Sequence, residues 1–147
     1  MDVDRFKQVN DSFGHPAGDL ALKAVAGVLL CELRRTDAVI RYGGDEFFLV
    51  FHDIPRQALA KKLEAMRERV AGIVVKEYPS LRLSVSIGGV LCDQTLQEYR
   101  SAYRRADEAL YLAKARGKNC LELWRPDGGK IFSPRAQKAG GCQGAGV

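Results

Sequence analysis

Two short acidic stretches carry the side chains of this sequence that best suit metal-ion chemistry. Asp45 and Glu46 follow the pair Gly43-Gly44, between apolar runs at 38–42 and 47–51. The runs predict two strands, and the glycines supply the positive φ that a two-residue hairpin needs. Adjacent carboxylates repel one another unless a cation intervenes, and magnesium prefers oxygen ligands. Two interpretations stay open: a metal-binding turn, or an ordinary Gly-Gly hairpin with solvated acids.

The second acidic stretch is Asp2-Val3-Asp4 at the amino terminus. In a strand, Asp2 and Asp4 would lie on the same side. The sequences Asn10-Asp11 and Gly14-His15-Pro16-Ala17-Gly18 that follow are typical of turns. The alternative interpretation of the acidic stretch is a polar, frayed terminus.

Apolar periodicity predicts three helices around these stretches. The first runs from Asp19 to about Arg34-Arg35, where basic side chains suit the negative end of the helix dipole. The second begins at Pro55, and the third begins near Thr95 or Gln97 and is capped by Gly117. The expected inner stripes are Leu22, Val25, Ala26, Leu29 and Leu33; Leu59, Leu63, Met66, Val70 and Ile73; and Tyr99, Tyr103, Ala106, Leu110 and Ala113. The expected solvated face of the second helix holds Lys61, Lys62, Arg67 and Arg69.

Two further strands complete the predicted fold. Residues 82–87 alternate between apolar and polar, and Gly88-Gly89 then permits a bulge or a close backbone approach. Residues 120–124 predict a short final strand, and the composition of residues 125–147 predicts a disordered tail. The order strand, helix, hairpin, helix, strand, helix, strand indicates an α/β or α+β domain whose sheet is layered by helices.

Composition narrows the class of protein. The 147 residues are 46% hydrophobic, which suits one soluble domain. No apolar run approaches the length of a membrane span and the first residues lack a secretory signal, so we expect a cytoplasmic location and no membrane contact in this segment. We interpret the four widely spaced cysteines as reduced thiols, although disulfides stay open in principle, and expect Cys31 and Cys92 to act as small hydrophobes.

The net charge of +5 is concentrated in the tail. Residues 125–147 hold four basic side chains and one acid, whereas the rest of the chain has 19 basic and 17 acidic residues. A polynucleotide-binding domain would show a basic stripe or interleaved aromatic and basic residues. Neither pattern is present, so we expect no polynucleotide partner.

Three motifs follow one another along the chain. They are Asp2-x-Asp4-x-Phe6-Lys7-x-x-Asn10-Asp11-x-x-Gly14-His15-x-x-Gly18-Asp19, then Gly43-Gly44-Asp45-Glu46-Phe47, and then Ala109-Leu110-Tyr111-x-Ala113-Lys114-x-x-Gly117-Lys118-Asn119. Together they resemble the GGDEF domain of diguanylate cyclases, over residues 2 to about 124. The resemblance implies a central mixed sheet flanked by helices, similar to nucleotidyl cyclases and polymerase palms, with the signature hairpin at its active edge. It also implies that the domain at 1–124 lacks its first helix and most of its first strand, and that a sensory domain lies upstream in the full-length protein.

The activity implied by the resemblance is the condensation of two GTP molecules into cyclic di-GMP, with release of two pyrophosphates. Each subunit of a transient homodimer would present one GTP. Mg²⁺ or Mn²⁺ ions would lower the pKa of the attacking 3′-hydroxyl and stabilise the leaving pyrophosphate. The alternative is a catalytically silent receptor domain for GTP or cyclic di-GMP.

Residue roles follow from the match to the motifs. Asp45 and Glu46 would be catalytic, and the metal would be held by Asp2, Asp45 and the Val3 carbonyl, while the role of Asp4 stays open. The residues implied to bind substrate are Asn10 and Asp19 at the guanine edge, and Phe6, Lys7, Lys114 and Lys118 at the triphosphate.

Arg34-x-x-Asp37 precedes the hairpin at the spacing of the family's inhibitory site, where the resemblance implies that product dimers bind. The planar arginine fork suits phosphate. The alternative for this tetrapeptide is a helix end followed by a turn. Arg67 is one candidate for the second arginine of such a site.

Overall fold

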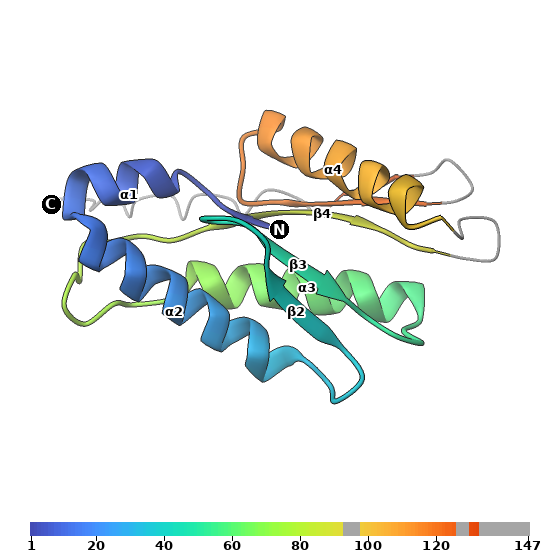
Figure 1. Cartoon of the computed structure of the whole chain (residues 1–147), viewed down its shortest axis with the longest axis horizontal. Coiled ribbons are helices and arrows are strands. Elements are labelled where there is room, and N and C mark those ends of the chain that lie inside the picture. Colours follow the sequence, from blue (N-terminus) through green and yellow to red (C-terminus); the bar gives the residue numbers. More distant parts are fainter. Residues whose placement is uncertain (93–97, 126–129, 133–147) are drawn as a thin grey trace, which may run out of the picture.

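The computed structural model describes residues 1–92, 98–125 and 130–132 (Figure 1). In chain order the elements are β1 (Asp2–Val3), α1 (Phe6–Phe13), α2 (His15–Glu32), β2 (Ala38–Arg41), β3 (Phe47–Val50), α3 (Arg56–Ala71), β4 (Val85–Val90), α4 (Tyr99–Ala115), β5 (Leu121–Trp124) and β6 (Lys130–Phe132). The structure thus contains the predicted order of strand, helix, hairpin, helix, strand, helix and strand, with α1 and β6 in addition.

The sheet is mixed, in the strand order β1-β4-β5-β6. β4 runs parallel to β5 and antiparallel to β1, and β5 runs antiparallel to β6. A parallel pair needs a crossover connection, and α4 supplies it between β4 and β5. Figure 1 shows α4 on one side of β4, with α2 and α3 on the other. The predicted fold class is confirmed.

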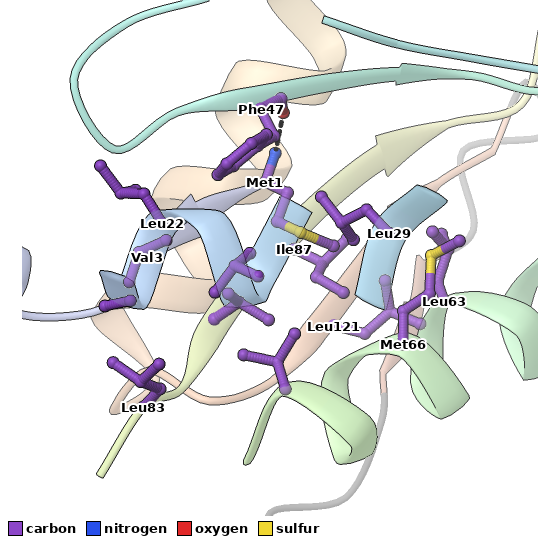
Figure 2. Close-up of a cluster of buried hydrophobic side chains, with 14 of the residues drawn as sticks. Met1, Val3, Leu22, Leu29, Phe47, Leu63, Met66, Leu83, Ile87 and Leu121 are labelled. Atoms are coloured by element: carbon purple, nitrogen blue, oxygen red, sulfur yellow. Dashed lines mark hydrogen bonds between the residues drawn. The ribbon is translucent and has the colours of Figure 1, made fainter. Parts of the chain in front are cut away.

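The β2–β3 hairpin joins this sheet through the first residues of the chain. Asp2 forms a β-bridge with Glu46, and the Val3 N–H donates to the Asp45 carbonyl at 3.0 Å. Met1 and Phe47 exchange two hydrogen bonds, one of them from the Met1 α-ammonium to the Phe47 carbonyl at 3.0 Å (Figure 2). These long-range bonds place the two acidic stretches on adjacent strands.

The turn of the hairpin differs from its prediction. Arg41 pairs with Phe47, so residues 42–46 form the loop, and the Tyr42 N–H donates to the Glu46 carbonyl at 2.9 Å inside it. Among the described glycines only Gly14 and Gly117 have positive φ. The predicted two-residue turn with positive φ at Gly43 and Gly44 is therefore wrong, because a longer loop closes without left-handed residues.

The turns predicted between residues 10 and 18 are also wrong. α1 covers residues 10–13 of this stretch and α2 covers 15–18, so the break between the helices falls at Gly14 (φ 83°). Pro16 lies in the first turn of α2, where helices tolerate its missing N–H. α2 ends at Glu32, short of the predicted Arg34-Arg35.

The core lies between the sheet and the helices α2 and α3 (Figure 2). Most members of the predicted stripes of these helices are buried, including Leu22, Val25 and Leu29 from α2 and Leu59, Leu63, Met66 and Val70 from α3. They pack with Val3, Val85, Ile87 and Leu121 of the sheet. Each buried side chain of this size contributes about 1.5–3 kcal/mol.

Two predictions of side-chain burial fail. Arg67 is 2% exposed rather than solvated, because it lies four residues after Leu63 and three before Val70 and therefore faces the core. In α4 the outermost member of the predicted stripe, Tyr99, is 65% exposed.

The predicted cysteine environments fail in part. Cys31 and Cys92 are exposed, contrary to their prediction as core hydrophobes, whereas Cys120 is buried. Both exposed thiols lie near the ends of apolar runs rather than inside them, at the end of α2 and after β4.

The strand predicted at 82–87 lies at Val85–Val90, so Gly88 and Gly89 belong to β4. The close approach predicted for them is confirmed at Gly88, where a Cβ would stand 2.1 Å from the Leu110 nitrogen of α4. The tail predicted to be disordered contains β6 at Lys130–Phe132, which corrects that prediction for these three residues. Most of the other tail positions lie outside the described residues. The predicted helix starts Thr95 and Gln97 also lie outside them.

Candidate nucleotide and metal site

The acidic centre forms where β1 meets the hairpin. Asp2 is 7% exposed, and Asp45 and Glu46 across the strand pair are half-buried. Asp2 is held in place on both sides, because β1 also pairs with Ser86 and Val85 of β4. Asp2 thus lies on a strand adjacent to Asp45 and Glu46, although more than forty residues of chain separate it from that pair.

Lys114 supplies the positive charge at this centre. Its Nζ lies 2.9 Å from Asp2 Oδ2, and its side chain is 35% exposed. Burial raises the pKa of Asp2 above its ordinary value; the Lys114 ion pair opposes that rise, and the nearby charges of Asp45 and Glu46 add to it. An ionised Asp2 therefore depends on a nearby positive charge, which Lys114 of α4 supplies.

The donor set suits a divalent ion in its chemistry. Asp2, Asp45 and Glu46 offer carboxylate oxygens, which are the ligands that magnesium and manganese prefer. Across residues 1–92, 98–125 and 130–132, however, no three His, Cys, Asp or Glu side chains converge closely enough to hold a metal. A metal bound here would therefore need a main-chain ligand, and the ammonium beside Asp2 marks the position where positive charge is stabilised.

Asp4 belongs to a different set of contacts. Its Oδ1 accepts from Ser86 Oγ at 2.6 Å, and its Oδ2 accepts from Ser84 Oγ at 2.7 Å and from the Asn119 N–H at 2.9 Å. The carboxylate is 6% exposed. With three donors around it, Asp4 ties β4 to the loop after α4 rather than facing the metal position.

Two of the predicted substrate residues, Asn10 and Phe6 of α1, pack against the start of α2. Asn10 and Phe6 lie against Gly18, where a Cβ would stand 2.0 Å from Asn10 Oδ1 and 3.1 Å from Phe6 Cζ. Asp19 follows Gly18 directly and is exposed, as is Lys7 on α1. The absence of a side chain at residue 18 therefore allows Asn10 and Phe6 to pack closely against α2.

The last predicted substrate residue lies in a left-handed turn. Gly117 has φ 112°, Lys118 φ 66° and Asn119 φ 49°. The Lys118 N–H donates to the Ala113 carbonyl at 3.2 Å, which closes the carboxyl end of α4 and confirms the predicted cap at Gly117. Lys114 and Lys118 therefore stand at the same end of this helix.

Comparison with known proteins agrees with this geometry. The family model described as "Diguanylate cyclase, GGDEF domain" matches residues 1–120. The chain belongs to the GGDEF family. Among curated relatives of this GGDEF domain, it is 39% identical over 127 residues to the diguanylate cyclase DosC of Escherichia coli K12, with 85% of this chain and 27% of DosC covered. It is 36% identical over 124 residues to the diguanylate cyclase DgcP of Pseudomonas aeruginosa, with 84% of this chain and 18% of DgcP covered. The GGDEF domain thus spans about a quarter or less of the length of these two relatives.

Solved structures show the same fold. The GGDEF domain of DgcB from Caulobacter crescentus, in complex with c-di-GMP, superposes with a TM-score of 0.77 at 30% identity, covering 83% of this chain and 73% of that one. The active GGEEF domain of a diguanylate cyclase from Vibrio cholerae gives 0.75 at 29% identity, covering 83% and 78%. No helix in the described ranges of this GGDEF domain combines the length and apolar character needed to cross a membrane.

The Arg34-x-x-Asp37 segment of this GGDEF domain has a clear structural role. Asp37 accepts hydrogen bonds from the backbone N–H groups of Arg34 at 3.0 Å and His52 at 3.4 Å, and pairs with Lys62 of α3 at 3.5 Å. Burial alone would raise the pKa of Asp37, but the two backbone hydrogen bonds and the Lys62 charge lower it below its ordinary value. Arg34 itself is exposed. The segment thus closes the turn before β2 and leaves the Arg34 side chain on the surface.

Arg67 does not suit the second arginine of an inhibitory site on this surface. Its guanidinium donates from Nε to Glu64 at 2.9 Å and from Nη1 to Asn119 Oδ1 at 2.8 Å, and it is buried. The helical phase of α3 already placed this residue on the apolar stripe, so the sequence contained the signal for its burial.

A cavity with aromatic rings at its edge is a feature of the GGDEF domain that the sequence motifs did not indicate. A cavity of about 470 Å³ lies beside the hairpin and is lined by β3, β4, α3 and α4. Four aromatic rings, of Tyr42, Phe48, Tyr99 and Tyr103, contact one another at its edge with centroids 6.1–6.3 Å apart. The spacing of Tyr99 and Tyr103 by four residues was the one sequence signal for this cluster.

Proposed function

We propose that this chain is the catalytic domain of a diguanylate cyclase, which condenses two GTP molecules into cyclic di-GMP and two pyrophosphates. The observation that carries the proposal is the backbone pairing of β1, which holds Asp2, with the hairpin residues Asp45 and Glu46, together with the ion pair between Asp2 and Lys114. Membership of the GGDEF family and identity to curated diguanylate cyclases support it.

In this proposal Asp2, Asp45 and the Val3 carbonyl hold a Mg²⁺ or Mn²⁺ ion. The ion supplies charge that acidifies the attacking 3′-hydroxyl and stabilises the leaving pyrophosphate. Lys114 neutralises Asp2 before substrate enters, and it then has the length and exposure to turn toward the triphosphate. Glu46 accepts the proton of the hydroxyl or supports the metal.

The substrate is recognised by residues of the first two helices and the end of α4. Asn10 and Asp19 bind the guanine edge, because its N1 and N2 donors suit a carboxylate and its carbonyl suits an amide. Lys7, Lys118 and the main chain at Phe6 bind phosphate oxygens. Cations at these positions stabilise the charge that develops during phosphoryl transfer.

One domain presents one GTP, so ring closure requires two copies of the chain in a transient homodimer. We further propose that a sensory domain upstream controls this encounter in the cytoplasm, and that Arg34 and Asp37 contribute to product inhibition. The exposed Arg34 guanidinium is consistent with phosphate or guanine binding, with Asp37 holding the turn.

The test is incubation of the chain with GTP and Mg²⁺, followed by mass spectrometry of the products. We expect cyclic di-GMP from the natural sequence and none from Asp45→Ala, while the matched control Glu77→Ala, at an exposed acid in the turn after α3, keeps the activity. Full activity in Asp45→Ala would refute the metal role. Calorimetric binding of cyclic di-GMP without any turnover, also in a version extended at its amino terminus, would favour a silent receptor instead.

A further inference from the structure

The largest fully buried side chain of the described residues is a charged one, Arg67 of α3. Its guanidinium donates to Glu64 Oε1 through Nε at 2.9 Å and Nη2 at 2.5 Å, and to Asn119 Oδ1 through Nη1 at 2.8 Å. A buried arginine is retained only where its fixed donors find partners. Two of the three bonds lie within α3, and the third reaches across the protein to the loop after α4.

Asn119 carries that connection further. Its side chain accepts from Arg67, and its backbone N–H donates to Asp4 Oδ2 at 2.9 Å. Asp4 is held in turn by Ser86 of β4 and by Ser84, which directly precedes that strand. A continuous set of hydrogen bonds therefore runs from α3 through Asn119 to the turn that follows Asp2.

Lys118 lies next to this connection and has no element of regular structure to fix it. It follows Gly117 after the end of α4, and both Lys118 (φ 66°) and Asn119 (φ 49°) adopt left-handed backbone conformations. Two consecutive non-glycine residues persist in that region only when tertiary contacts hold them. For residue 119 those contacts are the bonds to Arg67 and Asp4.

We propose that Arg67 and Asn119 are positioning residues, which fix the backbone at Lys118 so that its ammonium is aimed at the triphosphate. The inference rests on the proposed function, because it takes Lys118 as a phosphate contact. It adds two residues to the site that touch no substrate: Arg67 acts through Asn119, and Asn119 acts through its backbone on Lys118 and Asp4.

Asn119→Gly isolates the proposed link. Glycine adopts φ 49° without strain and keeps the N–H bond to Asp4, so the native contact that is lost is the bond to Arg67, and the freer glycine backbone acts in the same direction. The matched control is Asn119→Asp, which tolerates the left-handed region and keeps an oxygen that accepts from Arg67. Arg67→Lys tests the other end, because lysine keeps the charge but loses the two-sided fork.

The experiment is calorimetric titration of the full chain with 3′-deoxy-GTP and Mg²⁺, a substrate analogue that cannot attack. We expect Lys118→Ala, Asn119→Gly and Arg67→Lys each to weaken binding about tenfold, the size of one lost charged hydrogen bond, and Asn119→Asp to stay within about twofold. The double variant Lys118→Ala/Asn119→Gly should bind no more weakly than Lys118→Ala alone, since both changes remove one interaction. Thermal melts of each variant confirm that it is folded.

Two results would overturn the inference alone: natural affinity in Asn119→Gly while Lys118→Ala is weakened, or losses that multiply in the double variant, which would indicate a general structural effect. Natural affinity in Lys118→Ala would instead refute the phosphate contact assigned to Lys118, and the positioning role with it. If none of the variants, nor the natural chain, binds the analogue, the proposed function itself fails.

Discussion

The close packing of α4 on β4 makes Gly88→Ala the sharpest test of the fold that supports the site. A methyl group on Gly88 would stand 2.1 Å from the Leu110 nitrogen, 2.4 Å from the Ala106 carbonyl oxygen and 2.5 Å from Leu110 Cα. All three atoms belong to the backbone of α4, so no side-chain rotation relieves the clash. Since ordinary contacts between heavy atoms lie near about 3.5 Å, the helix must retreat by about 1–1.4 Å.

The expected loss of stability follows from that displacement. Overpacking in cores costs about 1–3 kcal/mol, and a clash with rigid backbone belongs at the upper end, about 3 kcal/mol. With a denaturant slope of about 2 kcal/mol per molar urea, the midpoint of unfolding should fall by about 1.5 M. α4 also carries Lys114, so the ion pair with Asp2 should lengthen, and the proposed formation of cyclic di-GMP should fall with it.

Urea titration followed by circular dichroism measures this effect. The matched control is Gly27→Ala in the middle of α2, where no atom lies within 4 Å of the added methyl group. This control should gain up to about 1 kcal/mol, because alanine is the better helix former. An unchanged midpoint and slope for Gly88→Ala would refute the close approach of α4 to β4.

Three further predictions concern the site and its charges. Burial lowers the pKa of the Met1 α-ammonium from 8.0 to about 6. The unfolded chain therefore binds more protons between pH 6 and pH 8, and the free energy of unfolding should rise by about 2 kcal/mol over this range. Acetylation of this amine should flatten the profile, and a rise that survives it would contradict the assignment. Asp2→Asn removes a proposed metal ligand, so it should abolish the proposed formation of cyclic di-GMP. Because burial raises the pKa of Asp2, the same change should raise the free energy of unfolding at pH 7, and this gain should fade as pH falls toward 3.8. A variant that is less stable in urea at pH 7 would count against this. Gly18→Ala forces the Asn10 amide away from residue 18, so the affinity for a GTP analogue, measured by calorimetry, should fall about tenfold. The melting temperature should change little, because alanine favours the helix. Unchanged affinity would exclude Asn10 from guanine binding.

Much of the fold could be predicted from the sequence because its signals are local. The period of apolar residues locates α2, α3 and α4, alternation locates β4, and Gly117 closes α4 with the positive φ expected of a cap. The motifs were sufficient to indicate the family. Where local signals misled, as in the stretch that forms α1 and the start of α2, residues typical of turns are accommodated by helix ends and by close packing at Gly18.

The sequence by itself determined which residue types are present for chemistry: paired acids at two places, lysines at the end of a helix, and glycines where backbones come close. Only the tertiary structure decided how they pair. Asp2 meets Lys114, and Asp4 meets Asn119, across more than a hundred residues of chain, and Arg67 proves to be a buried connection rather than a solvated charge. The docking of the hairpin and the order of the strands decide which side chains pair. The reason is that the energy of a charged side chain depends on the groups around it in space, and the spacing of residues along one strand or helix does not specify which other elements will lie beside it.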